Sequence, residues 1–288
     1  MINLQVQVLW LWKISTMSSS APKDQKPRLT FGVEFEFSLA HKAAGKDDLY
    51  PKDSRSITFL QDGLAKYQKE RFVFAHIHDT LNNAGFKTTT QYIEEEKYVD
   101  YLTDSEDPTI ESQDFWTVKH DNTVLPPDSA KDNYDWYDVE ITSPILAYNA
   151  ENIKLVRNVC KLLTRTYRIS CNETCGLHVH VGNGLAGFDL ATLRNLMGFI
   201  WAFEPQLGAI HPERRVKDTI HCASLRDKAI TKAGTTYLKA AIAEEKRLTG
   251  EGKTSGDPKI RSQLEAILWA NSINDIVDMM RSDDKKLA

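Results

Sequence analysis

Two glutamates and two histidines are spaced so that each pair could act on one ligand. Glu34 and Glu36 are separated by one residue, as are His178 and His180. On a β-strand, residues two apart point to the same side of the strand. Two carboxylates about 7 Å apart on one side repel each other unless a cation lies between them. The first pair could therefore bind a metal ion, and the second could join it with imidazole nitrogens.

The segments around these pairs have the pattern of half-buried strands. In residues 29–39 every second residue is apolar, and residues 177–182 alternate in the same way. A third segment, 137–142, places Asp138 and Glu140 on its polar side. A solvated outer face explains any one of these strands by itself. Three strands with acidic or imidazole faces instead predict one sheet whose polar side forms a site.

Amphipathic segments predict helices that cover the apolar side of this sheet. One is capped by Asn149 and runs to about Tyr167, and another is capped by Asp189 and limited by Pro205. Further helices are expected over about 64–83, from Pro258, and after a capping box of Ser272 and Asp275.

The donor types indicate which ligands the polar side could bind. Carboxylate oxygens with some imidazole suit Mg²⁺ or Mn²⁺, and such hard cations often accompany phosphate substrates. The sequence has no P-loop, no Gly-x-Gly-x-x-Gly turn and no Gly-x-Ser-x-Gly elbow. Bound ATP would therefore depend on metals and on arginines, for which Arg214 and Arg215 are candidates. A solvated basic turn is an equally good interpretation of these two arginines.

Cysteines near the histidine pair offer an alternative site. The run Cys171-x3-Cys175-x2-His178-x-His180 contains four possible zinc ligands. Its spacing differs from the usual Cys-x2-Cys knuckle, and two of the ligands would lie on a flat strand. A structural zinc site, or a zinc-dependent hydrolase that uses both histidines and a glutamate, is therefore the less favoured interpretation.

Composition limits the class of protein further. The 41% apolar and 26% charged residues are ordinary globular usage. Thirty-six basic and forty acidic side chains give a net charge of −4, which offers no basic field for nucleic acid. Four cysteines favour a reducing, cytoplasmic location, and no apolar run approaches the roughly 20 residues that span a membrane. We expect residues 1–27 to be a flexible leader, with Met1 or Met17 as the start; the oligomeric state is not predicted.

Five motifs, in this order, resemble those of the amidoligase family. The family belongs to the carboxylate–amine ligase superfamily, which includes glutamine synthetase and glutamate–cysteine ligase. The motifs are Phe31-Gly32-Val33-Glu34-Phe35-Glu36, Trp116-Thr117-Val118-Lys119-His120-Asp121, Val139-Glu140-Ile141-Thr142-Ser143-Pro144, Cys175-Gly176-Leu177-His178-Val179-His180-Val181 and His211-Pro212-Glu213-Arg214-Arg215. The resemblance covers roughly residues 29–225.

The resemblance implies an α+β fold of the glutamine synthetase type, in which a curved antiparallel sheet forms a cup backed by helices. It implies a single domain over residues 28–288 and an ATP-dependent ligase that forms an amide bond through an acyl phosphate. The substrates would be small-molecule or peptide carboxylates and amines. A later Glu-Phe-Arg strand of the family has no match here, so we expect the C-terminal part of the cup to be incomplete. The alternative is a non-catalytic binding or scaffold protein with the same fold.

The roles that the resemblance implies fall on eight residues. Metal ligation is implied for Glu34, Glu36, Glu140 and His178. Contact with ATP is implied for Glu36, His178, His180 and Arg214. Roles in catalysis are implied for Arg214 or Arg215, on phosphate, and for Asp121, which would place the amine or a metal.

Overall fold

The chain forms two compact units, each described by itself. The computed structural model divides at residue 185 into units of 1–185 and 186–288, and the prediction of one domain over 28–288 stays a prediction. The described residues are 29–42, 45–55, 64–90, 114–128, 133–184, 187–211, 243, 247 and 258–280.

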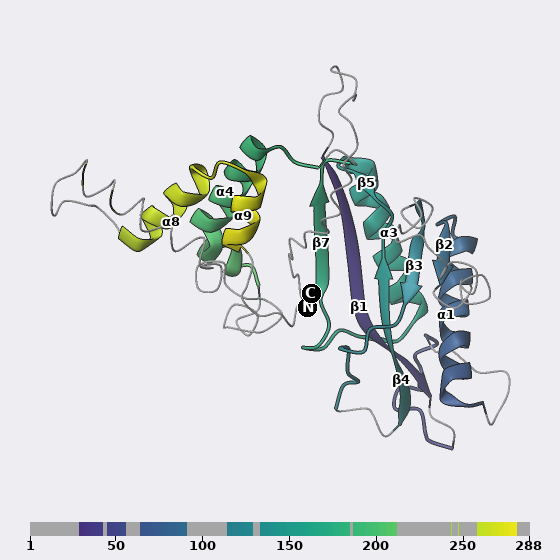
Figure 1. Cartoon of the computed structure of the whole chain (residues 1–288). Helices are drawn as coiled ribbons and strands as arrows, with labels where there is room; N and C mark the ends of the chain where they lie inside the picture. The colour runs from purple at the N-terminus through teal and green to yellow at the C-terminus, as the bar shows by residue number, and fades with distance from the viewer. Residues whose placement is uncertain are drawn as a thin grey trace, which may run out of the picture. The chain divides into compact units, whose positions relative to one another are not determined.

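The first unit is built on a mostly antiparallel sheet. Its strands follow the order β2-β3-β4-β1-β5, and β6 and β7 also pair with β1 (Figure 1). The β2–β3 pair is parallel, and the other strand pairs of the described residues are antiparallel. The strands are β1 Thr30–Lys42, β2 Thr88–Thr90, β3 Trp116–Lys119, β4 Tyr134–Thr142, β5 Leu146–Ala147, β6 Ile169–Ser170 and β7 Leu177–Gly182.

Strand β1 is the centre of this sheet. It pairs with β4 through Glu34–Lys42 and with β7 through Thr30–Phe35. Thr30 and Phe31 pair with both β5 and β7, so these two strands flank β1 on opposite edges. The prediction that three polar-faced strands share one sheet is confirmed, and β1 and β4 each extend three residues beyond the predicted segments.

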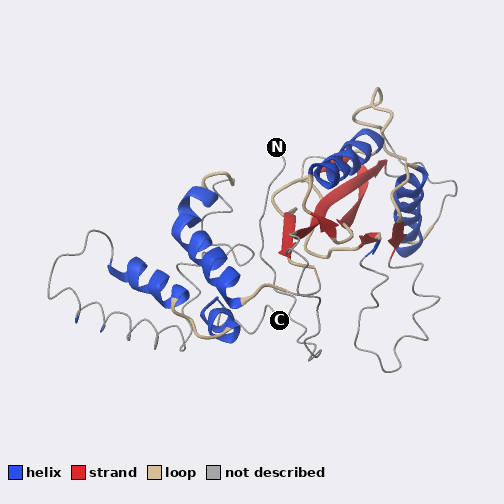
Figure 2. Cartoon of the chain, turned by 90° about the horizontal axis from the view of Figure 1, so that it is seen from above, coloured by secondary structure: helices blue, strands red, loops and turns tan. Residues whose placement is uncertain are grey.

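Two helices cover the apolar face of the sheet. Helix α1 (Lys66–Asn83) and helix α3 (Ala150–Thr166) lie on the same side of it (Figure 2). The core between them and the sheet includes the buried side chains of Phe37, Leu39, Phe74, Ile77, Val139, Ile141, Leu163 and Tyr167. Because residues alternate along a strand, the glutamates of β1 and β4 lie on the opposite face.

The predicted helix caps are present. The side chains of Asn149 and Asp189 each accept the backbone N–H three residues ahead, at 2.8 and 2.7 Å, and such a cap stabilises a helix by about 1 kcal/mol. Asp189 starts helix α4 (Leu190–Gly208). Pro205, expected to limit or kink the far end of this helix, lies inside it, and α4 ends three residues later at Gly208.

The second unit contains three described helices: α4, α8 (Pro258–Leu268) and α9 (Ile273–Met280). The predicted capping box before α9 is confirmed. Ser272 N–H donates to Asp275 Oδ2 at 2.9 Å, and Asp275 N–H donates to Ser272 Oγ at 3.1 Å. The fold is therefore mixed α+β. Among the described residues, no helix is both long enough and apolar enough to span a membrane.

Candidate functional site

Strand register places four of the predicted site residues in two adjacent rows on the polar face. In one row, Glu34 on β1 lies opposite His178 on β7. In the next, Glu36 lies opposite Glu140 on β4, which in turn lies opposite Lys119 on β3. Residues from four strands, distant in the sequence, thus become neighbours.

Imidazoles and carboxylates form direct contacts in these rows. His178 Nδ1 lies 2.8 Å from Glu34 Oε2, and its Nε2 lies 3.2 Å from Glu36 Oε1. His180 Nε2 lies 2.9 Å from Glu34 Oε1. We call Glu34, Glu36, Glu140, His178 and His180 the acid–imidazole cluster. The structure thus brings together five of the eight predicted site residues.

The two histidines stabilise the charged form of Glu34. Burial disfavours the charge of Glu34, but hydrogen bonds from His178 and His180 outweigh it and hold its pKa well below the usual range. Burial would lower the pKa of His178, yet the hydrogen bond to Glu34 and the charge of Glu36 raise it above its ordinary value. Glu34 and His178 therefore favour the charged forms of each other.

The charged forms of the other two carboxylates, Glu36 and Glu140, are disfavoured. Burial raises the pKa of Glu36, and the charges of Asp121 and Glu34 add to the shift, although His178 opposes it. Burial also raises the pKa of Glu140, with Glu34 and Asp121 adding to it and Lys119 opposing it. Burial is the main cause in both cases, so the fold disfavours the ionised forms of these two carboxylates. Carboxylate oxygens are the donor type that a hard divalent cation prefers.

A backbone contact fixes Glu36 from the side of β7. Its Oε2 accepts the N–H of Gly176 at 2.7 Å, and its own N–H donates to the Gly176 carbonyl at 3.1 Å. The carboxylate therefore has one oxygen anchored by the backbone and the other facing His178.

Asp121 lies in the loop that follows β3. Its Oδ1 accepts the N–H of Thr123 at 2.8 Å and the hydroxyl of Thr123 at 2.7 Å. Further along the loop, the Leu125 carbonyl accepts the hydroxyl of Ser38 on β1 at 2.8 Å. These bonds hold the loop against the polar face, and the effect of Asp121 on the pKa of Glu36 shows that its charge reaches the cluster.

The cysteines do not form a zinc site with the histidines. Cys171 is exposed, and buried Cys175 has its Sγ 3.8 Å from the Ser170 carbonyl and 3.7 Å from Asn172 Oδ1. Within the described ranges, no group of three or more His, Cys, Asp and Glu side chains is arranged to hold a metal ion. In the acid–imidazole cluster, the carboxylates pair with imidazoles and with a lysine instead.

Three basic residues remain to be placed. Arg214 and Arg215 lie outside the described residues, so their roles stay predictions. Lys119 had no role assigned, yet its Nζ lies 2.9 Å from Glu140 Oε1. The sequence does contain a pattern that could have indicated this position. Apolar Trp116 and Val118 alternate with Thr117 and Lys119, which places Lys119 on the polar face of the strand.

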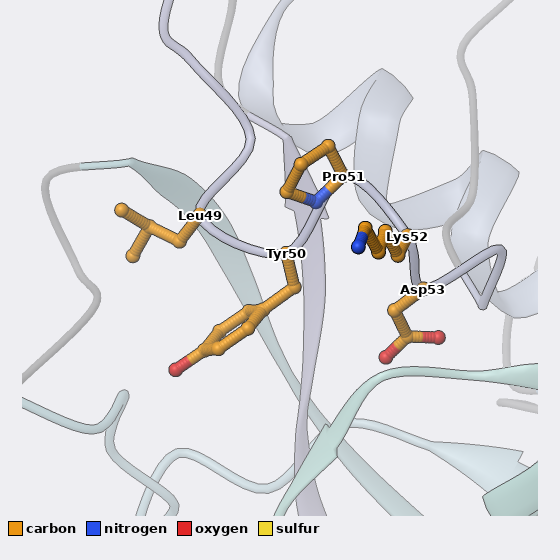
Figure 3. A pocket seen from close by; sticks show the side chains of 5 residues that line it. All are labelled: Leu49, Tyr50, Pro51, Lys52 and Asp53. Carbon is orange, nitrogen blue, oxygen red and sulfur yellow. The ribbon is translucent and has the colours of Figure 1, made fainter.

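Residues 49–53 line a hollow (Figure 3). It borders Arg168, which hydrogen-bonds Asp48 and the Tyr50 carbonyl. The Arg168 carbonyl accepts the N–H of Ala40, so this region lies toward the C-terminal end of β1. The hollow therefore does not involve the predicted site residues.

Comparison with known proteins identifies a family. A family model described as "Putative amidoligase enzyme" matches residues 27–249. No curated protein and no solved structure matches the chain significantly. The matched range contains the acid–imidazole cluster and Asp121, as well as Arg214 and Arg215.

Proposed function

The chain belongs to the amidoligase family, and from this premise we propose that it is an ATP-dependent ligase that joins a carboxylate to an amine. The observation that carries the proposal is the acid–imidazole cluster on the face of the sheet opposite α1 and α3, where burial disfavours the charges of Glu36 and Glu140. A phosphate substrate does not bind to such a surface by itself, so the proposal includes a divalent cation.

The donor types of the cluster, carboxylate oxygen and imidazole nitrogen, suit Mg²⁺ or Mn²⁺, although the described side chains are not arranged around a metal position as they stand. In this proposal Glu34, Glu36, Glu140 and His178 hold the cation, after exchanging the partners that they now have. Burial and neighbouring charges raise the pKa of Glu36 and of Glu140, so a cation nearby would relieve a real electrostatic penalty. When bound, the cation neutralises and orients the phosphates of ATP.

The reaction has two steps, because an unactivated carboxylate is a poor electrophile. First, a substrate carboxylate oxygen bonds to the γ-phosphorus of ATP, and the bond to ADP breaks. Second, the amine nitrogen bonds to the carbonyl carbon of the acyl phosphate, loses a proton, and inorganic phosphate leaves. Phosphoryl transfer needs mainly charge neutralisation and alignment from the protein.

The remaining predicted residues have roles around these two steps. We assign Asp121 to placing the amine, because the loop that carries it is bonded to the polar face. His180 and His178, with Glu36, contact the nucleotide, and Arg214 or Arg215 neutralises its phosphates. The substrates are small-molecule or peptide carboxylates and amines, and the sheet of the first unit corresponds to the cup of the glutamine synthetase fold.

The test is ADP release by the full chain with ATP, Mg²⁺ and pools of carboxylic acids and amines. We expect Mg²⁺-dependent release that needs both an acid and an amine. Glu36→Gln should lower it about 10²-fold or more, the scale for removal of one group that stabilises transition-state charge. Glu151→Gln, which removes an exposed carboxylate from the first turn of α3, should leave it unchanged.

Three results would contradict the proposal in different ways. Turnover that is equal in Glu36→Gln and the wild type would remove the cluster from the active site. No binding of ATP by calorimetry would favour a non-catalytic binding protein. Stoichiometric zinc in protein purified without added metal would favour the hydrolase.

A further inference from the structure

The backbone of Leu125 joins the loop after β3 to the turn that precedes β7. Its N–H donates to Thr174 Oγ1 at 2.8 Å, and its carbonyl accepts the side-chain amide of Asn172 at 2.5 Å. The hydroxyl of Ser38 on β1 donates to the same carbonyl at 2.8 Å. The side chain of Leu125 is 55% exposed. At this point the loop is therefore held by hydrogen bonds to its backbone and not by burial of the apolar side chain.

The two side chains of the turn also bind each other, which closes a ring of hydrogen bonds. Asn172 Oδ1 accepts the hydroxyl of Thr174 at 2.7 Å and its N–H at 2.8 Å. The Leu125 N–H thus donates to the Thr174 hydroxyl, this hydroxyl donates to Asn172, and the Asn172 amide donates back to the Leu125 carbonyl. Because an amide and a hydroxyl can each donate and accept, the closed ring fixes the orientation of both side chains. We call Asn172, Thr174 and the Leu125 backbone the loop clamp.

On one side, the loop clamp leads to Asp121. The Asp121 carbonyl accepts the N–H of Val124 at 3.1 Å, and the Val124 side chain is buried. The Asp121 carboxylate binds Thr123 through both the backbone N–H and the hydroxyl. The short segment from Asp121 to Leu125 is therefore internally bonded, and a displacement of Leu125 would move the Asp121 carboxylate with it.

On the other side, the loop clamp leads to Glu36. The N–H of Cys175 donates to the Asn172 carbonyl at 3.2 Å, which tightens the turn. The next residue, Gly176, donates its N–H to Glu36 Oε2 and accepts the Glu36 N–H. One turn thus contacts the acid–imidazole cluster and the loop of Asp121 at the same time.

The two carboxylates differ in how firmly their own elements hold them. Glu36 lies on a strand that is paired on both sides, whereas Asp121 lies on a loop. Loops are more mobile than the strands that they connect. A group that places a substrate must keep its position to within about 0.5 Å. The position of Asp121 relative to Glu36 therefore depends on what anchors the loop.

We infer that Asn172 and Thr174 are positioning residues, which fix the loop of Asp121 relative to Glu36 and thereby set where the amine binds. This inference rests on the proposed function, in which Asp121 places the amine. Neither side chain has to contact a substrate for this role. Loosening the loop clamp should therefore impair use of the amine and leave use of ATP unchanged.

The test is the substitution Thr174→Val in the full chain, which keeps the shape of the side chain and removes its hydroxyl. The Leu125 N–H loses its acceptor, so its exchange with D₂O, measured by nuclear magnetic resonance, should become about tenfold faster, the scale of one hydrogen bond. Enzymatic turnover is measured with ATP, the pool of carboxylic acids, and hydroxylamine as the amine, by formation of hydroxamate. The KM for hydroxylamine should rise about tenfold or more, and the KM for ATP should not change.

Two further variants separate positioning from a general effect on the fold. Thr174→Ser keeps the hydroxyl and should restore both the slow exchange and the low KM for hydroxylamine. Thr164→Val is the matched control, because it removes a hydroxyl that donates to the Cys160 carbonyl within α3; it should change neither quantity. A residue with only a structural role would lower the amount of folded protein and leave the KM for each substrate as it is.

The failure of the inference can be told from the failure of the proposed function. If the wild type forms hydroxamate and Thr174→Val has the same KM for hydroxylamine, the inference is overturned and the proposed function stands. An equal rise in the KM for ATP and for hydroxylamine, or unchanged exchange of the Leu125 N–H, would also overturn the inference alone. If the wild type forms no hydroxamate and releases no ADP, the proposed function fails and the inference fails with it.

Discussion

Two regions along β1 contain charged side chains. The fold stabilises the charged form in one region and disfavours it in the other. Toward the C-terminal end of β1, the guanidinium of Arg168 donates to Asp48 Oδ1 at 2.6 Å, to the Tyr134 hydroxyl at 3.1 Å and to the Tyr50 carbonyl at 2.8 Å. The hydrogen bond from Arg168 holds the pKa of Asp48 well below its usual range. In this region, which we call the arginine network, the fold stabilises the charges that it buries.

The acid–imidazole cluster has the reverse balance. Burial raises the pKa of both Glu36 and Glu140, and the neighbouring His178 and Lys119 oppose this rise without cancelling it. The free energy of unfolding is therefore lower than it would be with neutral side chains at these positions. Ionisable groups whose charge the fold disfavours are typical of binding and catalytic sites. The comparison thus separates a structural ion-pair network from a site.

The largest effect should follow from breaking the arginine network. Arg168→Met leaves Asp48 without its cation and removes hydrogen bonds that hold residues 48–53. Loss of the hydrogen bonds made by the buried guanidinium should lower the free energy of unfolding by about 2 kcal/mol, the scale for hydrogen bonds to a charged group. Urea unfolding measures this loss, and Arg157→Met, on the exposed side of α3, is the control. A loss no larger than that of the control would show that the network is not structural.

An effect of opposite sign is expected in the cluster. Glu36→Gln removes a carboxylate whose raised pKa shows that its charge is disfavoured, and Gln can still accept the Gly176 N–H. The free energy of unfolding at pH 7 should stay equal or rise by up to about 1 kcal/mol. A fall of several kcal/mol in urea unfolding would mean that Glu36 is structural, and the contrast between the two regions would fail.

The smallest effect is the pH dependence of this difference. A carboxyl whose folded-state pKa is raised lowers stability at neutral pH, and that penalty disappears as the pH falls through the raised pKa toward the ordinary value of 4.5. The advantage of Glu36→Gln over the wild type should therefore shrink between pH 7 and pH 4.5. Urea unfolding of both proteins at several pH values measures it. An advantage that grows on acidification would reverse the sign of the proposed shift.

The sequence predicted many of the strands and helices, but it predicted little of how the strands pair. The alternation in β1, β4 and β7 predicted which face each glutamate and histidine occupies, and the caps at Asn149 and Asp189 followed from local chemistry. Register is set by long-range pairing, so the opposition of Glu36 and Glu140 had no local signal. Two partners of Arg168, Asp48 and Tyr50, lie more than a hundred residues before it, in a polar loop without periodicity.

Binding of Mn²⁺ to the wild type and to Glu36→Gln tests the central claim most directly, since this variant is expected to be no less stable than the wild type. Electron paramagnetic resonance of the full chain in the presence of ATP should show stoichiometric binding to the wild type. The same titration should show binding weakened by at least about tenfold in Glu36→Gln, the scale for loss of one metal contact. Equal binding by the two proteins, or none by either, would contradict the assignment of a divalent cation to the acid–imidazole cluster.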